Sequence, residues 1–378
     1  MTRESAISRA TRHFEEGRFI EDLARRVAIR TESQVPESRP YMDVYLEQEI
    51  APAFERMGFK VDILPNPVEG VGPILLAERI EDPDLPTVLS YGHGDVIRGL
   101  EGQWREGLSP WTLKQEGERY YGRGSADNKA QHSINMAALE TVIAERGRLG
   151  FNAKFMLETG EELSSPGLRA FCEQHRERLK ADVLIASDGP RLAAKRPTLY
   201  LGSRGAGNLN FTVGLREGAH HSGNWGGLLA NPGIILAHAL ASIVTREGKV
   251  LVRELLPRHI PESVRAALRD CAPEPEEGEP AIDAWWGEPG LTAAERSTRG
   301  TRSRSSRSAP GIPTTLSTPF PARRLRRARS ASLPEPIRAP SSRSCAVIST
   351  RTASAWLRSA WRARASCRPR GSTPIIRG

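Results

Sequence analysis

Between residues 41 and 188, short apolar runs alternate with stretches whose apolar residues recur at helical spacing, and this alternation limits the possible folds most. The apolar runs at 59–64, 73–78, 87–91, 153–158 and 182–187 resemble buried strands in length and character. Helical spacing is found at 41–58, which ends at a glycine, after Lys129, and across 165–180. The alternation predicts an α/β fold with a mixed, mostly parallel sheet flanked by helices.

The pattern changes at Gly205. An alternating strand at 208–215, a glycine-rich loop and a helix over 232–244 follow. A chain of 378 residues is long enough for two domains. We therefore expect an α/β domain over 1–204, then a smaller α+β domain over 205–296.

Residues 297–378 differ in composition from the rest. They contain 18 Arg, no Lys and one acidic residue, Glu335, so their charge is +17, which leaves −8 of the total +9 for residues 1–296. Asp, Asn, Gln, His and Tyr are also missing, and codons for all these amino acids carry adenine at the middle position. We expect a frameshift near Ser297 and no packed core beyond it. A natural disordered arginine-rich tail is the alternative.

Composition also limits location and metal ligands. The N-terminus is too charged for a signal peptide, and no apolar run approaches the roughly 18 residues of a membrane span. We therefore expect a cytoplasmic protein with no membrane partner. Four widely spaced cysteines indicate neither a disulfide framework nor a cysteine-rich zinc site. Any metal must bind to histidine and carboxylates.

Four segments place residues able to bind metal just after predicted strands. They contain His93 and Asp95, Asp127, Glu161 and Glu162, and Asp188. The carboxyl ends of strands are where α/β proteins build their sites. Zinc accepts imidazole nitrogen and carboxylate oxygen, and one bridging carboxylate can hold two ions. Each motif alone is better explained without a metal: a single histidine after a strand is more often structural, a glutamate pair is usually a solvated loop, and Asp188 could be a turn residue. Together the motifs favour a two-metal site.

The order and spacing of these motifs resemble the di-zinc metallopeptidase and amidohydrolase family of aminoacylase, carboxypeptidase G, acetylornithine deacetylase and succinyl-diaminopimelate desuccinylase. The resemblance covers about residues 15–296. It implies that 1–204 is a catalytic α/β domain and that 205–296 is an inserted, here incomplete, α+β lid or dimerisation domain. It also implies a site for two Zn²⁺ ions, with Co²⁺ or Mn²⁺ as alternative metals. His93 and Asp188 would bind one ion, Glu162 would bind the other, and Asp127 would bridge both. It further implies that Asp95 orients the His93 ring, that Glu161 is the general base, and that a cis peptide bond follows Asp127.

One more histidine enters through the resemblance. His221, in the sequence HHSGNWGG, resembles a lid-domain histidine that reaches the partner subunit's active site in dimeric family members and stabilises the developing oxyanion. A loop histidine that caps the glycine-rich turn is the alternative. The family also needs a later histidine for the second zinc, but the last one here is His259. We therefore expect one of the two zinc positions to be weak or empty.

These inferences predict a zinc-dependent hydrolase of peptide or N-acyl-amino-acid amide bonds, a homodimer in its intact form, with dipeptidase-like or carboxypeptidase-like activity favoured. The aberrant tail is expected to impair this chain. Two alternatives stay open: an inactive truncated relic, and a protein that binds nucleic acid or acidic surfaces through the arginine-rich tail. Because the missing amino acids indicate a reading error, we expect no nucleic-acid partner.

Overall fold

The computed structural model divides the chain into two compact units, Met1–Gly189 and Pro190–Gly378. Each unit is described by itself. The structure describes residues 2–189, 191, 193, 196–199, 207–216, 220–256, 259–273, 275, 280–298, 304–305, 314–318 and 375–377. Within these residues, no helix has both the length and the apolar character required to cross a bilayer.

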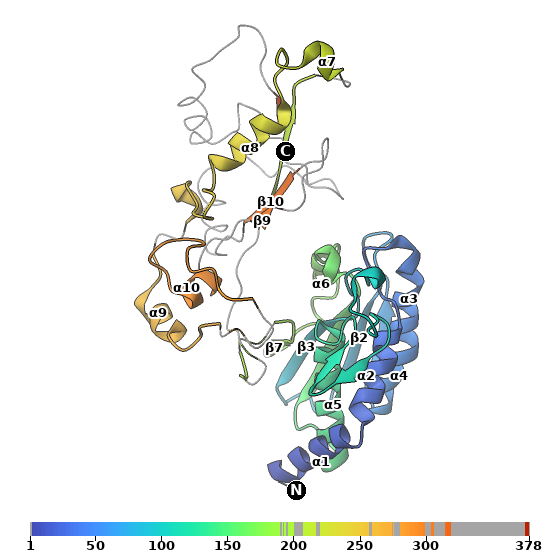
Figure 1. Cartoon of the computed structure of the whole chain (residues 1–378). Helices are drawn as coiled ribbons and strands as arrows, with labels where there is room; N and C mark the ends of the chain where they lie inside the picture. Colours follow the sequence, from blue (N-terminus) through green and yellow to red (C-terminus); the bar gives the residue numbers. More distant parts are fainter. Residues whose placement is uncertain are drawn as a thin grey trace. The chain divides into compact units, whose positions relative to one another are not determined.

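A five-stranded mixed sheet forms the centre of the first unit (Figure 1). Its strands are β1 Lys60–Leu64, β2 Ile74–Arg79, β3 Thr87–His93, β6 Asn152–Glu158 and β7 Val183–Ala186. The order is β1-β2-β6-β3-β7, with antiparallel pairing of β2 to both β1 and β6, and parallel pairing of β3 to both β6 and β7. All five strands predicted from the apolar runs are confirmed. A separate hairpin joins β4 Lys114–Glu116 to β5 Arg119–Tyr121.

Helices surround this sheet. They are α1 Arg3–Glu15, α2 Arg18–Ala28, α3 Arg39–Val44, α4 Ala51–Arg56, α5 Lys129–Arg146 and α6 Leu168–Gln174, with short 3-10 turns at Pro36–Ser38, Glu101–Gln103 and Glu161–Leu163. The helix predicted over 41–58 is present, but its middle, Tyr45–Ile50, is a π-helical segment between α3 and α4. Gly58, with φ +78°, follows the end of α4, as the sequence indicated.

The two faces of the sheet are covered by different helices (Figure 1). On one face, Tyr45 and Phe54 from the helical run 39–56 and Met136 from α5 pack against Leu75 and Phe155 of the sheet. On the other face, Phe171 of α6 packs with a second cluster, which contains Leu76, Leu89 and Met156. Helices on both faces follow from strands that are apolar on both sides.

Strand register brings the ends of three strands together. Parallel pairing sets His93, the last residue of β3, beside Glu158, the last residue of β6. Tyr91 of β3 pairs with Ala186 of β7, so the chain leaving β7 towards Asp188 emerges at the same edge. The sheet therefore delivers three of the candidate motifs to one place.

The second unit contains a four-stranded sheet of order β11-β8-β10-β9. Its elements are β8 Gly207–Gly214, α7 Ser222–Trp225, α8 Pro232–Ala241, a 3-10 turn at Arg253–Leu255, α9 Glu262–Leu268, α10 Ala293–Thr298, β9 Arg304–Ser305, β10 Thr314–Thr318 and β11 Ile375–Arg377. Three short strands of the segment 297–378 thus pair within this sheet. Residues 297 and 298 end α10, and the rest of that segment lies outside the described residues. The division after Gly189 precedes the expected boundary at 204, and the three-part organisation and the tail's disorder stay predictions.

Candidate metal centre

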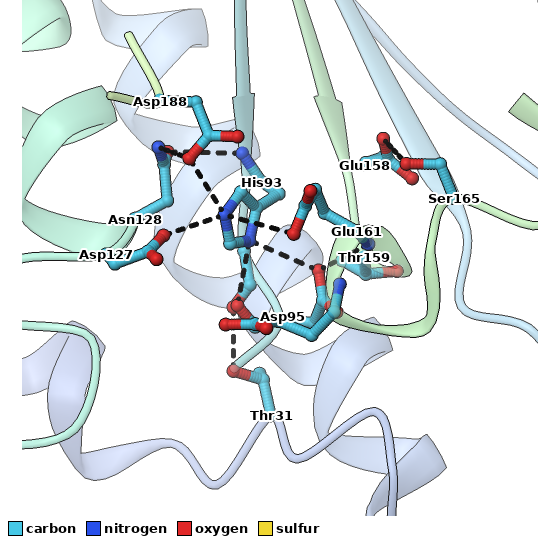
Figure 2. A network of polar contacts seen from close by, with 12 residues as sticks. Thr31, His93, Asp95, Asp127, Asn128, Glu158, Thr159, Glu161, Ser165 and Asp188 are labelled. Atoms are coloured by element: carbon cyan, nitrogen blue, oxygen red, sulfur yellow. Dashed lines mark hydrogen bonds and ion pairs between the residues drawn. The ribbon is translucent and has the colours of Figure 1, made fainter. Parts of the chain in front are cut away.

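Side chains from four segments converge on the ring of His93 (Figure 2). The His93 ring is fully buried, and its Nε2 atom lies 3.0 Å from Oδ1 of Asp127, 3.5 Å from Oδ1 of Asp188 and 3.9 Å from Oε2 of Glu161. The ligand atoms of His93, Glu161 and Asp188 all lie within 4.8 Å of one another. Such a set of one imidazole and several carboxylates suits zinc and other divalent cations.

The electrostatics of this cluster favour a cation. Burial lowers the pKa of His93, but hydrogen bonds to the carboxylates of Asp127, Asp188 and Asp95 outweigh it and raise the pKa to about 12. Burial raises the pKa of Glu161 to about 7; His93 opposes the rise, while the nearby carboxylates of Asp188 and Glu162 add to it. Carboxylates held this close repel one another, and a cation bound among them offsets this repulsion. The residues present therefore fit a bound divalent metal.

Asp127 and Asn128 join the site to helix α5. The peptide bond between them is cis, as the resemblance implied. The fully buried Asn128 side chain lies between two strand ends: its Oδ1 accepts a hydrogen bond from the His93 amide at 3.2 Å, and its Nδ2 donates to the Ser187 carbonyl at 2.5 Å. Nδ2 also lies 3.3 Å from Oδ1 of Asp188. Asn128 thus fixes two candidate ligands relative to each other.

Asp95 holds the turn that carries the two glutamates. Its fully buried carboxylate accepts one hydrogen bond from the Glu161 amide and another from the Glu162 amide, each 3.1 Å long. The Nδ1 atom of His93 lies 3.0 Å from the backbone carbonyl of Asp95 and 3.4 Å from its Oδ1. Contact with the His93 ring was expected, whereas the support of the turn was not.

Three fully buried polar side chains, those of Tyr45, Lys129 and His132, form a layer next to Asn128. Nδ1 of His132, on α5, is 3.1 Å from Oδ1 of Asn128, and its Nε2 is 2.6 Å from the Tyr45 hydroxyl. Burial lowers the pKa of His132 well below its ordinary value, so the ring is neutral, with one nitrogen donating and one accepting. Since Oδ1 of Asn128 accepts from Nδ1, Nε2 accepts from Tyr45. Lys129 lies over the Tyr45 ring and donates to the Arg26 and Ile29 carbonyls.

The structure supports the expected roles of Glu162 and His221 less directly. Burial and the charge of Asp127 raise the pKa of Glu162, which indicates that these two carboxylates are close. However, the group of three that could hold an ion contains Glu161, whereas the resemblance assigned Glu162 as the ligand and Glu161 as the base. His221 belongs to the second unit, where its Nδ1 accepts from the Gly223 amide and caps α7. This is the capping alternative, and a catalytic role for His221 stays a prediction.

Sequence reasoning missed the supporting residues. The helical spacing over 41–58 and after Lys129 predicts helices at Tyr45 and His132, and the apolar run 153–158 predicts a strand that ends at Glu158, but none of these patterns indicates a supporting role. Asn128 lies directly after Asp127, so the motif itself was the signal available for it. Glu158 carried a weaker signal, an acidic residue closing an apolar run.

Comparisons with known proteins all identify peptidases. The family model described as "Peptidase family M20/M25/M40" matches residues 89–349. The Beta-Ala-His dipeptidase of Rattus norvegicus is 33% identical over 253 residues, which cover 62% of this chain and 50% of that protein. The Cysteinylglycine-S-conjugate dipeptidase of Corynebacterium striatum is 29% identical over 231 residues, covering 60% of this chain and 48% of that protein. The chain thus spans about half the length of the curated relatives it matches.

Solved structures share the fold. Human carnosine dipeptidase 1 superimposes with a TM-score of 0.69 at 24% identity, covering 86% of this chain and 74% of that one. An M20 family metallo-carboxypeptidase from Sulfolobus solfataricus gives a TM-score of 0.62 at 21% identity, covering 80% and 71% of the two chains. Because the family model matches well over half of the sequence, this chain belongs to peptidase family M20/M25/M40.

Proposed function

We propose that this chain is the metal-binding part of a zinc-dependent hydrolase of peptide or N-acyl-amino-acid amide bonds, with dipeptides the favoured substrates. The convergence of Asp127, Glu161 and Asp188 on Nε2 of His93 carries the proposal. The dipeptidase names of the curated relatives favour small peptides over larger amides.

The proposed ligands are His93 and Asp188 for one ion, Glu162 for the other and Asp127 between them. A divalent metal bound here would act as a Lewis acid towards the amide carbonyl. Support comes from the donor set, since all four side chains offer nitrogen or oxygen atoms of the kind zinc binds.

Glu161 is the proposed general base. With its pKa raised to about 7 by burial, its carboxyl group can both take a proton from an attacking water and return it to the departing amine near neutral pH. Asp95 holds the Glu161 amide, which keeps the carboxylate beside His93. His221 is proposed to assist as a hydrogen-bond donor to the carbonyl oxygen, in a dimer, with its capping of α7 as the competing role.

The test combines zinc titration with hydrolysis of β-Ala-His and Cys-Gly by the full chain. We expect saturable zinc binding that His93→Ala weakens by at least about tenfold, because an imidazole ligand is lost. An exposed histidine of the second unit provides the control: His238→Ala should leave zinc binding unchanged, as His238 lies on α8. Equal zinc affinities of His93→Ala and the wild type would refute the proposed site. The hydrolysis rates of the wild-type chain test whether its activity is impaired, as expected from the tail.

A further inference from the structure

Glu158 is a buried acidic residue with an unusual arrangement of partners. It ends β6 beside His93 and is fully buried. Its Oε1 atom accepts two hydrogen bonds, from the Tyr91 hydroxyl at 2.7 Å and from the Ser165 hydroxyl at 2.8 Å (Figure 2 shows the second). Its Oε2 atom has no hydrogen-bond partner among the described residues. Burying a carboxyl group this way is costly, so a local benefit must offset it.

The two hydrogen-bond donors belong to different segments. Tyr91 lies on the neighbouring strand β3, and Ser165 lies just beyond the 3-10 turn Glu161–Leu163. Glu158 and Ser165 are therefore the two ends of the loop that carries Glu161 and Glu162. The Ser165 hydrogen bond closes this loop at its base, and Tyr91 anchors the base to the sheet.

The exit of the loop needs this support. Ser164 and Ser165 have φ values of +70° and +48°, in the left-handed region that costs a non-glycine residue roughly 1 kcal/mol. Within the loop, the Ser164 amide donates to the Glu161 carbonyl and the Ser165 amide donates to the Gly160 carbonyl. On the opposite side, the Asp95 carboxylate accepts the Glu161 and Glu162 amides. The loop is thus held by one carboxylate at each side.

We propose that Glu158 is a positioning residue that fixes the 158–165 loop through Tyr91 and Ser165, so that Glu161 and Glu162 are directed at the metal centre. In this role Glu158 acts through Tyr91 and Ser165 on the loop, and the role requires no contact with a substrate. The roles of the two glutamates rest on the proposed function, whereas the closing of the loop does not.

The arrangement requires an acceptor oxygen at Oε1. Glu158→Gln keeps this oxygen in a side chain of the same size, so Tyr91 and Ser165 retain their partner. Glu158→Leu fills similar space without an acceptor. Ser165→Ala removes one donor from a partly exposed position and leaves the core of the sheet intact, which makes it the milder variant.

The first experiment is hydrogen exchange of the full chain without metal. For Glu158→Leu, we expect exchange of the amides of residues 161–165 at least about tenfold faster than in the wild type, because the loop opens locally. Glu158→Gln should stay within about threefold of the wild type. Amides in α5 should be unchanged in both variants, which shows that the unit is folded. Equal exchange of the loop in Glu158→Leu and the wild type, or in Glu158→Leu and Glu158→Gln, would overturn the proposal.

If Glu158→Leu does not fold, exchange will be faster throughout α5 as well. Ser165→Ala then decides the question. Faster exchange confined to residues 161–165 supports the closing of the loop by Ser165, and unchanged exchange there overturns it.

The second experiment is a Co²⁺ titration followed by visible absorption. Glu158→Leu, or Ser165→Ala in its place, should weaken Co²⁺ binding by about tenfold, although no ligand is removed, and Glu158→Gln should not. A wild-type chain that binds no Co²⁺ would refute the proposed function while leaving the exchange result intact. Unweakened Co²⁺ binding in a variant with a loosened loop would instead overturn the positioning role alone.

Discussion

The hydrogen bond between Tyr45 and His132 offers a direct test of the buried layer beneath the metal centre. Both side chains are fully buried, and the hydroxyl lies 2.6 Å from Nε2 of His132. Tyr45→Phe removes this hydroxyl alone. The ring stays against Lys129, whose Nζ is 4.9 Å from the ring centre, and against His132, whose ring is 6.0 Å away.

The expected magnitude follows from the group that loses its partner. Nε2 of neutral His132 is left as a buried acceptor without a donor, which costs about 1–3 kcal/mol. The substitution therefore should lower the free energy of unfolding of the first unit by this amount. Exchange of the most protected amides would become about 5 to 150 times faster.

Hydrogen exchange of β3 and β6 measures this change in the first unit, independently of the second. Tyr41→Phe is a matched control in the same helical run, because Tyr41 is 44% exposed and should change stability by no more than about 0.5 kcal/mol. Equal effects of Tyr41→Phe and Tyr45→Phe would refute the inference that the Tyr45 hydroxyl supports the site.

Three further predictions concern the same unit. Gly94→Ala should destabilise it by about 1–3 kcal/mol in the same exchange measurement, because the new Cβ would lie 2.7 Å from the Tyr45 ring, whereas Gly102→Ala, with nothing within 4 Å, should be tolerated. Zinc titration of Glu161→Gln and Glu162→Gln distinguishes ligand from base: we expect only the second to weaken binding, by about tenfold or more, and the reverse result would assign the ligand role to Glu161. Asp127→Ala should weaken zinc binding by at least about tenfold, and the exposed Asp84→Ala should not; equal affinities would argue against Asp127 as a ligand.

The sequence by itself was sufficient for the framework of the first unit. Apolar runs of strand length predicted all five strands, because the contrast between apolar and polar residues is local and survives without tertiary information. It also located His93, Glu161 and Asp188, because residues that follow parallel strands emerge at one edge of a sheet, whereas Asp127 precedes α5 and follows no strand of this sheet. Together, these two rules predict that Asp188 lies near His93, although the two residues are 95 positions apart in the sequence.

Tertiary structure decided what supports those ligands. Tyr45 and His132 are 87 positions apart and meet only because the helical run 39–56 and α5 cover the same face of the sheet. Tyr91 reaches Oε1 of Glu158 because the β3–β6 register sets these strands side by side, and a local pattern does not specify that register. Ser165 reaches the same oxygen because the loop after β6 turns back through the positive φ values of Ser164 and Ser165. The carboxylate of Asp95 likewise faces the amides of Glu161 and Glu162, 66 and 67 positions away. Local pattern thus determined which residues could bind a metal, while packing across long sequence separations determined which buried groups hold them in place.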